Sequence, residues 1–182
     1  IAFVGTPCQV IGLRKIYSTP AAANGGGGQP IIIGLFCTWA LGHSFLQLLE
    51  ETVPSGRILK TDVPPPPAQQ FDIETQHDKV ALPLDDVRPH ILDACATCHD
   101  MTAELADISV GSAEGISGWN TVLVRTERGE QLVQQALDRG LLEAQELPET
   151  NLEHLQQAST NKRVRAFQRL SEQSGSLEDL GH

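Results

Sequence analysis

The sequence has few aromatic residues, few basic residues and no long apolar segment. Aromatic side chains make up 4% of its 182 residues, so any core must consist mainly of Leu, Ile, Val and Ala. The chain has 13 Lys and Arg against 23 Asp and Glu, which gives a formal net charge of −10. Nucleic acids and anionic lipid surfaces both attract basic proteins, so this charge balance argues against either partner.

Membrane insertion is also not expected. The longest apolar run, residues 31–36, has the length of a strand, whereas crossing a bilayer takes roughly 20 apolar residues. No signal peptide is visible, and we therefore expect a cytoplasmic protein. The sequence begins without Met, in residues 1–4 that have the pattern of a core strand. For this reason we expect that an N-terminal part of the protein is missing from this sequence.

Segments with the pattern of strands and segments with helical periodicity alternate irregularly along the chain. Strands are predicted at residues 1–4, 31–36, 57–63, 70–74, 79–82, 107–110, 121–125 and 141–147. Helices are predicted at residues 9–17, 44–53, 130–139 and 152–171, the third of which is ended by Gly140. The predicted fold class is α/β, with α+β as the other possibility: a mixed sheet with flanking helices and a C-terminal helix.

Two segments interrupt this pattern. Residues 18–30 contain four consecutive glycines and have too little side-chain volume to pack, so we expect a flexible insertion. Residues 64–67 are all proline, which is typical of a stiff polyproline spacer. We expect one domain over residues 1–147, followed by a helical tail over residues 148–182.

Four cysteines give the clearest chemical signal: Cys8, Cys37, Cys95 and Cys98. The first two each follow an apolar strand, and the last two form a C-x-x-C pair. Ligands bind at the carboxyl ends of strands in open α/β sheets, so two cysteines at that edge and a pair on a loop can converge on one site. Four thiolates suit a 4Fe–4S cluster, and they also suit zinc. The simpler interpretation is inert buried cysteines and a chance C-x-x-C.

The residues alone leave these alternatives open. Among metals, the spacing of the cysteines alone favours zinc, because structural zinc sites are the more common kind. However, zinc ribbons usually have two C-x-x-C pairs, and this sequence has one. Residues 95–99 also match C-x-x-C-H, the attachment signature of c-type haem. The one methionine, Met101, is too close in sequence to ligate the far face of such a haem, which would also leave Cys8 and Cys37 unexplained. A domain of this length does not need disulfides.

Several segments together resemble, in the same order, those of the family of coenzyme F420 hydrogenase/dehydrogenase beta subunits. Residues 4–9 and 12–15 resemble its G-T-P-C-Q and G-L-R-K segments, and residues 33–37 resemble its second cysteine segment. Residues 88–89 and 95–100 resemble its R-P-x-C-x-x-C-x-D segment, with extra residues before the first cysteine. Residues 103–111 and 118–129 continue the match, so the resemblance covers about residues 1–145.

The resemblance implies an oxidoreductase subunit with two cofactors. Cys8, Cys37, Cys95 and Cys98, on loops around the sheet, would ligate one 4Fe–4S cluster. FAD would contact the turn around Cys8 and one further loop, at Gly5, Thr6, Pro7, Gln9, Gly118, Trp119 and Asn120. Electrons would pass between cluster and FAD, and a hydride between FAD and coenzyme F420 or a similar acceptor, in a complex with other hydrogenase or dehydrogenase subunits. The alternative function is a zinc-stabilised structural or interaction domain without redox activity.

Several of these residues also have ordinary structural explanations. The segment from Gly5 to Pro7 is equally consistent with a plain strand-to-helix turn, and Trp119 with the hydrophobic anchor of a surface loop. Asp100 could accept backbone N–H groups that shape the cysteine loop, but we favour the other interpretation, in which it caps a helix that begins near Thr102. The basic residues Lys162, Arg163 and Arg165 could meet an acidic partner or a phosphate, but we expect them to lie on a solvated helix face.

Overall fold

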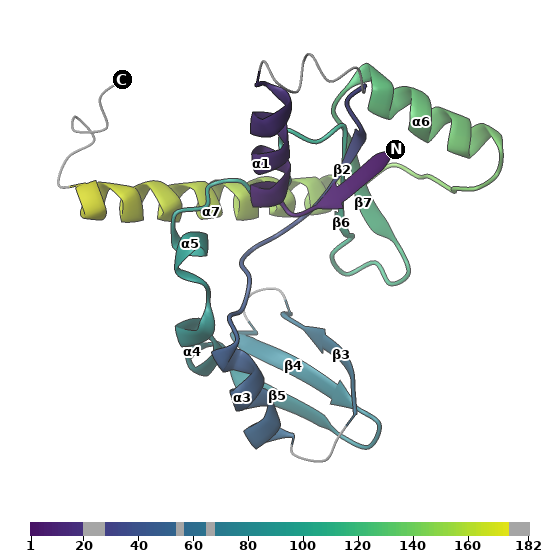
Figure 1. Cartoon of the computed structure of the whole chain (residues 1–182). Coiled ribbons are helices and arrows are strands. Elements are labelled where there is room, and N and C mark those ends of the chain that lie inside the picture. Colours follow the sequence, from purple (N-terminus) through teal and green to yellow (C-terminus); the bar gives the residue numbers. More distant parts are fainter. Residues whose placement is uncertain (20–27, 54–56, 65–67, 175–182) are drawn as a thin grey trace. The chain divides into compact units, whose positions relative to one another are not determined.

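The computed structural model describes residues 1–19, 28–53, 57–64 and 68–174 (Figure 1). The predicted glycine-rich insertion and proline spacer fall mainly on residues 20–27 and 65–67, outside the described residues. The chain forms two compact units, one of Ile1–Thr38 with Thr97–His182 and the other of Trp39–Ala96. Within the described ranges, no helix has both the length and the apolar character that a membrane span requires.

The first unit contains a four-stranded mixed sheet with strand order β1-β2-β6-β7 (Figure 1). Its strands are β1 (Ala2–Gly5), β2 (Ile31–Leu35), β6 (Ile108–Ser112) and β7 (Asn120–Val124). β1, β2 and β6 are mutually parallel, and β7 returns antiparallel to β6. Helix α1 (Pro7–Tyr17) lies in the connection from β1 to β2, as parallel strands require a crossover. The predicted α/β class with a mixed sheet is confirmed.

The core of this unit lies on one face of the sheet. Val10 of α1 and Ile32 of β2 are fully buried there, together with Ala103 and Ala106 from the segment that precedes β6. That segment passes directly over Gly34. A Cβ atom at Gly34 would overlap the Ala103 Cβ and lie 2.9 Å from the Ala106 Cβ. The close approach of this segment to β2 therefore depends on glycine.

Gly34→Ala is expected to destabilise the chain by about 1–3 kcal/mol, because the extra methyl group overpacks a tight core contact. Gly12→Ala is the matched control, since Gly12 is exposed on α1 and a Cβ there would meet nothing within 4 Å. That change is expected to stabilise the helix by about 0.5–1 kcal/mol. Urea unfolding followed by circular dichroism measures both, and equal midpoints for the two variants would contradict the packing argument.

The opposite face of the same sheet is apolar and partly exposed. The strand registers place Val4, Leu35, Val122 and Val124 on that face. Their exposed fractions are 57%, 41%, 46% and 44%. Exposed apolar side chains that share one face of a sheet commonly mark a contact with another protein segment.

Two helices follow the sheet. Thr126 caps α6 (Glu127–Asp138) by accepting the Gly129 N–H at 3.2 Å. Gly140, at φ +66°, follows its end as predicted. The strand predicted at residues 141–147 is wrong, because that segment is irregular and Leu141 is 71% exposed. The predicted C-terminal helix is confirmed as α7 (Glu149–Ser174).

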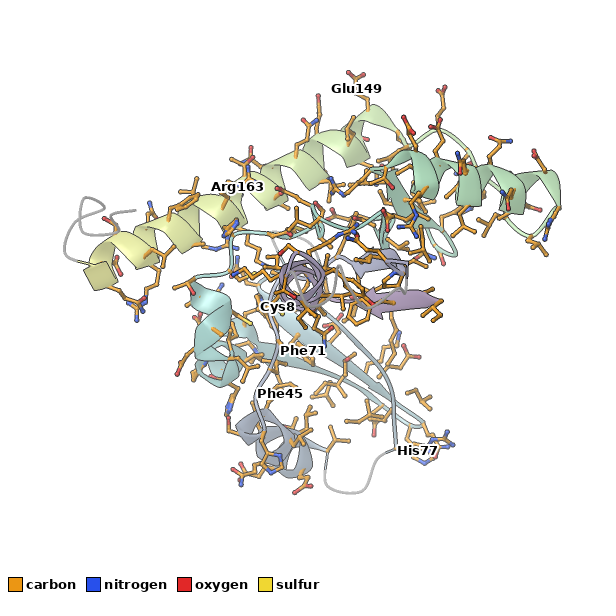
Figure 2. All side chains as sticks on the ribbon, turned by 45° about the horizontal axis from the view of Figure 1, so that its top comes forward. Cys8, Phe45, Phe71, His77, Glu149 and Arg163 are labelled. Atoms are coloured by element: carbon orange, nitrogen blue, oxygen red, sulfur yellow. The ribbon has the colours of Figure 1, made fainter. Side chains whose placement is uncertain are left out.

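The second unit combines helix α3 (Ser44–Thr52) with an antiparallel sheet in the order β3-β4-β5. Its strands are β3 (Ile58–Asp62), β4 (Gln70–Thr75) and β5 (Lys79–Pro83), which confirms the predicted hairpin. Three short helical segments follow, α4 (Leu84–Val87), η1 (Arg88–His90) and α5 (Asp93–Ala96). Phe45 and Phe71, labelled in Figure 2, pack edge to face in its core with ring centroids 5.1 Å apart.

Candidate functional site

Two of the four cysteines lie at the same edge of the mixed sheet. β1 and β2 are parallel, and Gly5 is paired with Gly34 at their carboxyl ends. Cys8 comes three residues after Gly5, and Cys37 comes three residues after Gly34. Both thiols therefore follow the carboxyl ends of adjacent parallel strands, the usual place for ligands in open α/β sheets.

The turn that carries Cys8 is held by local hydrogen bonds. The Thr6 N–H donates to Oε1 of Gln9 at 2.9 Å, and Thr6 Oγ1 lies 3.3 Å from Cys8 Sγ. Gly5 has no space for a side chain, because a Cβ would lie 2.7 Å from the Phe3 ring. Pro7 occupies the first turn of α1, and Cys8 is exposed beside it (Figure 2). The predicted cofactor-binding residues of this turn thus also have structural roles.

The loops of Cys37 and Cys98 meet in the first unit. The Cys37 N–H donates to the Met101 carbonyl at 2.8 Å, and Cys98 Sγ lies 3.5 Å from the Asp100 carbonyl oxygen. The buried Asp100 carboxylate accepts N–H groups of Thr102 at 3.0 Å and Glu104 at 2.9 Å. No helix begins at Thr102, so the prediction of a helix cap was wrong. Asp100 instead fixes a tight turn behind the cysteine loop.

Cys95 belongs to the second unit, so the C-x-x-C pair spans the boundary between the two units. Within its unit the Ala40 N–H donates to Cys95 Sγ at 3.3 Å, and the Cys95 N–H donates to the Leu92 carbonyl at 2.8 Å. A backbone N–H directed at sulfur is a contact that stabilises a thiolate.

All four cysteines are present as thiols rather than disulfides. Among the residues that the structure describes, no three His, Cys, Asp or Glu side chains are grouped so that they could hold one metal ion. In a cubane cluster each cysteine binds its own iron, so its four sulfur atoms are spaced more widely than the ligands of a single ion.

The second predicted cofactor loop reaches the same edge of the sheet. β6 is parallel to β2, so the hairpin from β6 to β7 leaves from the edge where Cys8 and Cys37 lie. Gly118 takes φ +82° in this hairpin, and Asn120 begins β7 opposite Ser112. Trp119 is 36% exposed. Two predicted loops from distant parts of the chain therefore share one edge, while a contact with FAD stays a prediction.

The prediction that Lys162 lies on a solvated helix face is wrong. This residue is 4% exposed rather than solvated, and its Nζ donates to the carbonyl oxygens of Cys37 and Asp100. The available signal was the spacing in α7, where Lys162 stands four residues before the buried Ala166. Arg163 and Arg165 are exposed, as expected.

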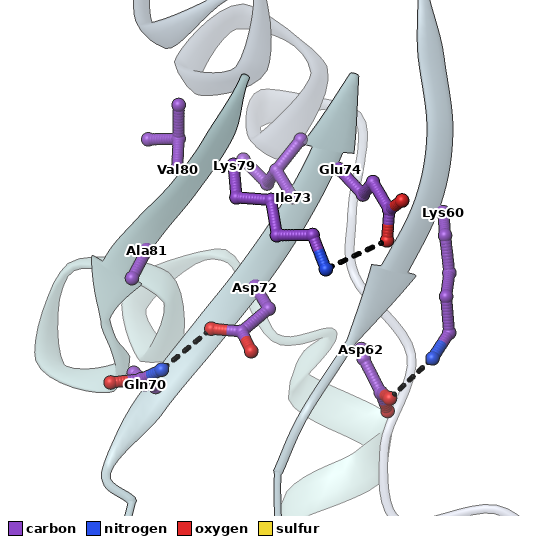
Figure 3. A pocket seen from close by; sticks show the side chains of 9 residues that line it. All are labelled: Lys60, Asp62, Gln70, Asp72, Ile73, Glu74, Lys79, Val80 and Ala81. Atoms are coloured by element: carbon purple, nitrogen blue, oxygen red, sulfur yellow. Dashed lines mark hydrogen bonds and ion pairs between the residues drawn. The ribbon is translucent and has the colours of Figure 1, made fainter. Parts of the chain in front are cut away.

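The second unit has a polar hollow on its sheet (Figure 3). Its charged side chains bind one another: Lys60 Nζ lies 2.9 Å from Asp62, and Lys79 Nζ lies 3.4 Å from Glu74. The hydrogen bond to Asp62 and the charge of that carboxylate raise the pKa of Lys60. Since both lysines are already paired with carboxylates, this hollow offers little charge for recognising an anionic ligand.

The sheet edge thus has two thiols, Cys8 and Cys37, which follow the carboxyl ends of adjacent parallel strands. Comparison with known proteins identifies the family. Residues 1–150 match the sequence profile of the C terminus of the beta subunit of coenzyme F420 hydrogenase/dehydrogenase. The chain belongs to this family.

Individual relatives agree with this assignment. The chain is 31% identical over 169 residues to the beta subunit of the coenzyme F420 hydrogenase of Methanococcus voltae, covering 90% of this chain and 59% of that protein. It is 30% identical over 146 residues to the coenzyme F420-dependent sulfite reductase of Methanocaldococcus jannaschii, covering 72% of this chain and 23% of that protein. The chain thus spans less than two thirds of the length of either relative.

A solved structure shares the fold. A chain of the F420-reducing NiFe hydrogenase complex from Methanosarcina barkeri aligns with a TM-score of 0.85 at 24% sequence identity. The alignment covers 96% of this chain and 61% of that chain. At this identity the match establishes the fold.

Proposed function

We propose that this chain is the electron-transferring part of an oxidoreductase linked to coenzyme F420. It would carry electrons between a 4Fe–4S cluster held by four cysteines and FAD, with hydride transfer to or from coenzyme F420 or a similar acceptor. The observation that carries the proposal is the common sheet edge at which Cys8, Cys37 and the β6–β7 hairpin lie. Family membership supports the linkage to coenzyme F420.

The proposed iron ligands are Cys8, Cys37, Cys95 and Cys98. Their chemistry fits the group, because thiolate sulfur is the usual ligand of iron–sulfur clusters. The Ala40 N–H already points at Cys95 Sγ, and the Thr6 hydroxyl can donate to Cys8 Sγ when that thiol is deprotonated. Hydrogen bonds of this kind stabilise the negative charge of the sulfur atoms and so favour the reduced state of the centre.

Residues of two loops would hold the flavin. Backbone N–H groups of the turn from Gly5 to Pro7 and the hairpin from Gly118 to Asn120 can orient FAD beside the cysteines. When bound, FAD converts between the single electrons of a cluster and the two electrons of a hydride. The contribution of this chain is to bind and position these groups, and no side chain is assigned as an acid or base.

We also propose that the chain works in a complex with other hydrogenase or dehydrogenase subunits. The apolar sheet face of Val4, Leu35, Val122 and Val124 supports a protein partner, because these side chains are each more than 40% exposed. The structural relative from Methanosarcina barkeri is itself part of a hydrogenase complex.

Anaerobic purification with analysis of iron, acid-labile sulfide, zinc and flavin tests the cofactor proposal. About four irons and four sulfides per chain are expected for one cubane cluster, together with flavin absorbance and fluorescence. One zinc without visible absorbance would instead support the zinc-stabilised alternative. A sharp Soret band would indicate haem bound through residues 95–99 and would contradict the proposal.

A further inference from the structure

The buried lysine of α7 connects two cysteine-bearing segments. Lys162 Nζ donates to the Cys37 carbonyl oxygen at 2.7 Å and to the Asp100 carbonyl oxygen at 2.8 Å. The first carbonyl belongs to the loop after β2, and the second follows Cys98 by two residues. One ammonium group therefore binds the main chains of both loops. Lys162 is buried there, with 4% of the residue exposed.

The charge of this ammonium group has no ion-pair partner within the described ranges. The nearby Asp100 carboxylate accepts the Thr102 and Glu104 N–H groups instead, and both hydrogen bonds that Lys162 Nζ makes among the described residues go to backbone carbonyl oxygens. A buried charge is costly unless an opposite charge lies close to it. The position of Lys162 therefore indicates an anionic group at the cysteine loops.

Neighbouring residues of α7 hold the same loop. Arg163 forms an ion pair with Glu104, and the Phe167 ring stacks on His99 at a centroid distance of 5.8 Å and an interplanar angle of 16°. Figure 2 shows Arg163 near the middle of this long helix. Three side chains of α7 thus fix residues 99–104, so the place of the Lys162 ammonium relative to Cys37 and Cys98 is well defined.

We propose that Lys162 positions the Cys37 and Cys98 loops and supplies the positive charge that compensates a thiolate-ligated cluster, which raises its reduction potential. This inference rests on the proposed function. Reduction adds negative charge to a cluster, and a fixed cation nearby favours the more negative state. A lysine on a solvated helix face would have no such effect, because water screens its charge.

The experiment compares wild type, Lys162→Met, Lys162→Arg and Arg165→Met as anaerobically purified, cluster-loaded chains. Arg165→Met is the matched control, because it removes the same formal charge from an exposed position of the same helix. Midpoint potentials come from redox titrations monitored by electron paramagnetic resonance. We expect Lys162→Met to shift the midpoint to more negative values, and Lys162→Arg and Arg165→Met to leave it close to that of wild type.

A second readout separates charge compensation from a purely structural role. The free energy of unfolding is measured for wild type and Lys162→Met in the loaded and the iron-free state. We expect the substitution to cost more stability when the cluster is present, because only then is the charge compensated. If Lys162→Met does not fold, Lys162→Gln replaces it, since Gln keeps N–H donors and removes the charge.

The outcomes distinguish this inference from the proposed function. A wild-type chain without iron and sulfide would overturn the proposed function and the inference with it. A loaded wild type whose midpoint and loading equal those of Lys162→Met would overturn the inference alone. Equal costs of the substitution in the loaded and iron-free chains would likewise show that Lys162 acts only on the fold.

Discussion

Cys37→Ser is expected to remove nearly all iron and acid-labile sulfide from the anaerobically purified chain. The cysteine follows β2 by two residues, and its N–H is bonded to the Met101 carbonyl, so its position is set by the sheet and by the Cys98 loop. A serine oxygen is a harder and less acidic ligand than a thiolate and holds cluster iron poorly. The visible absorbance of the cluster should disappear together with the iron.

The fold is expected to survive this change. Ser and Cys are similar in size, and Cys37 lies outside both buried apolar clusters of the described residues. Far-UV circular dichroism should therefore match that of the wild type. Thr38→Ser is the control, since Thr38 is the exposed neighbour of Cys37 and its change leaves all four thiols in place.

Substituting the other cysteines tests the whole ligand set. Serine at position 8, 95 or 98 should cause the same loss of iron if all four residues bind one cluster. If only the Cys95 and Cys98 variants lost metal while Cys37→Ser kept full iron and sulfide, the four-thiolate site would be wrong. The C-x-x-C pair would then bind metal by itself.

The sequence was most informative where local patterns decide the structure. The apolar runs predicted β1 and β2, and helical periodicity predicted α1, α3, α6 and α7. The cysteine positions after two strands led to a shared sheet edge, and the parallel pairing of Gly5 with Gly34 places Cys8 and Cys37 there. Parallel strands of a βαβ unit leave little choice about which ends meet.

Features that depend on contacts between distant residues were not predicted. The segment at 141–147 has a strand-like composition, but a strand also needs a hydrogen-bonding partner, which composition does not reveal. The burial of Lys162 follows from how α7 meets the Cys37 and Asp100 loops, more than 60 residues away in sequence. The compact second unit at Trp39–Ala96 is likewise defined by contacts rather than by a compositional boundary.

Asp107 is one such long-range feature, because its carboxylate joins three elements of the first unit. It is 2% exposed and accepts the Ile32 N–H at 2.8 Å and the Thr126 hydroxyl at 2.9 Å. It also forms an ion pair with Arg14 of α1 at 3.3 Å. These bonds fix the start of β6 between β2, α1 and the cap of α6.

The same contacts set the charge state of this carboxylate. Burial by itself would raise the pKa of Asp107, but the Ile32 N–H, the Thr126 hydroxyl and the charge of Arg14 together lower it. The unfolded-state pKa of an aspartate is about 3.9. Because the pKa is lowered in the folded state, the ionised carboxylate stabilises the fold above about pH 3.9. This stabilisation is lost as the pH falls through the pKa that Asp107 has in the folded state.

Asp107→Asn is therefore expected to destabilise the chain by about 2–4 kcal/mol at pH 7. An amide accepts fewer hydrogen bonds than a carboxylate, and it leaves Arg14 without its partly buried counterion. Urea unfolding at a series of pH values should show the difference from wild type shrinking as the pH falls below about 3.9. Asp138→Asn, at an exposed position of α6, should change stability by less than about 0.5 kcal/mol throughout. A difference that stays constant down to acid pH would mean that the charge of Asp107 contributes nothing, and that its hydrogen bonds to Ile32 and Thr126 alone hold β6 in place.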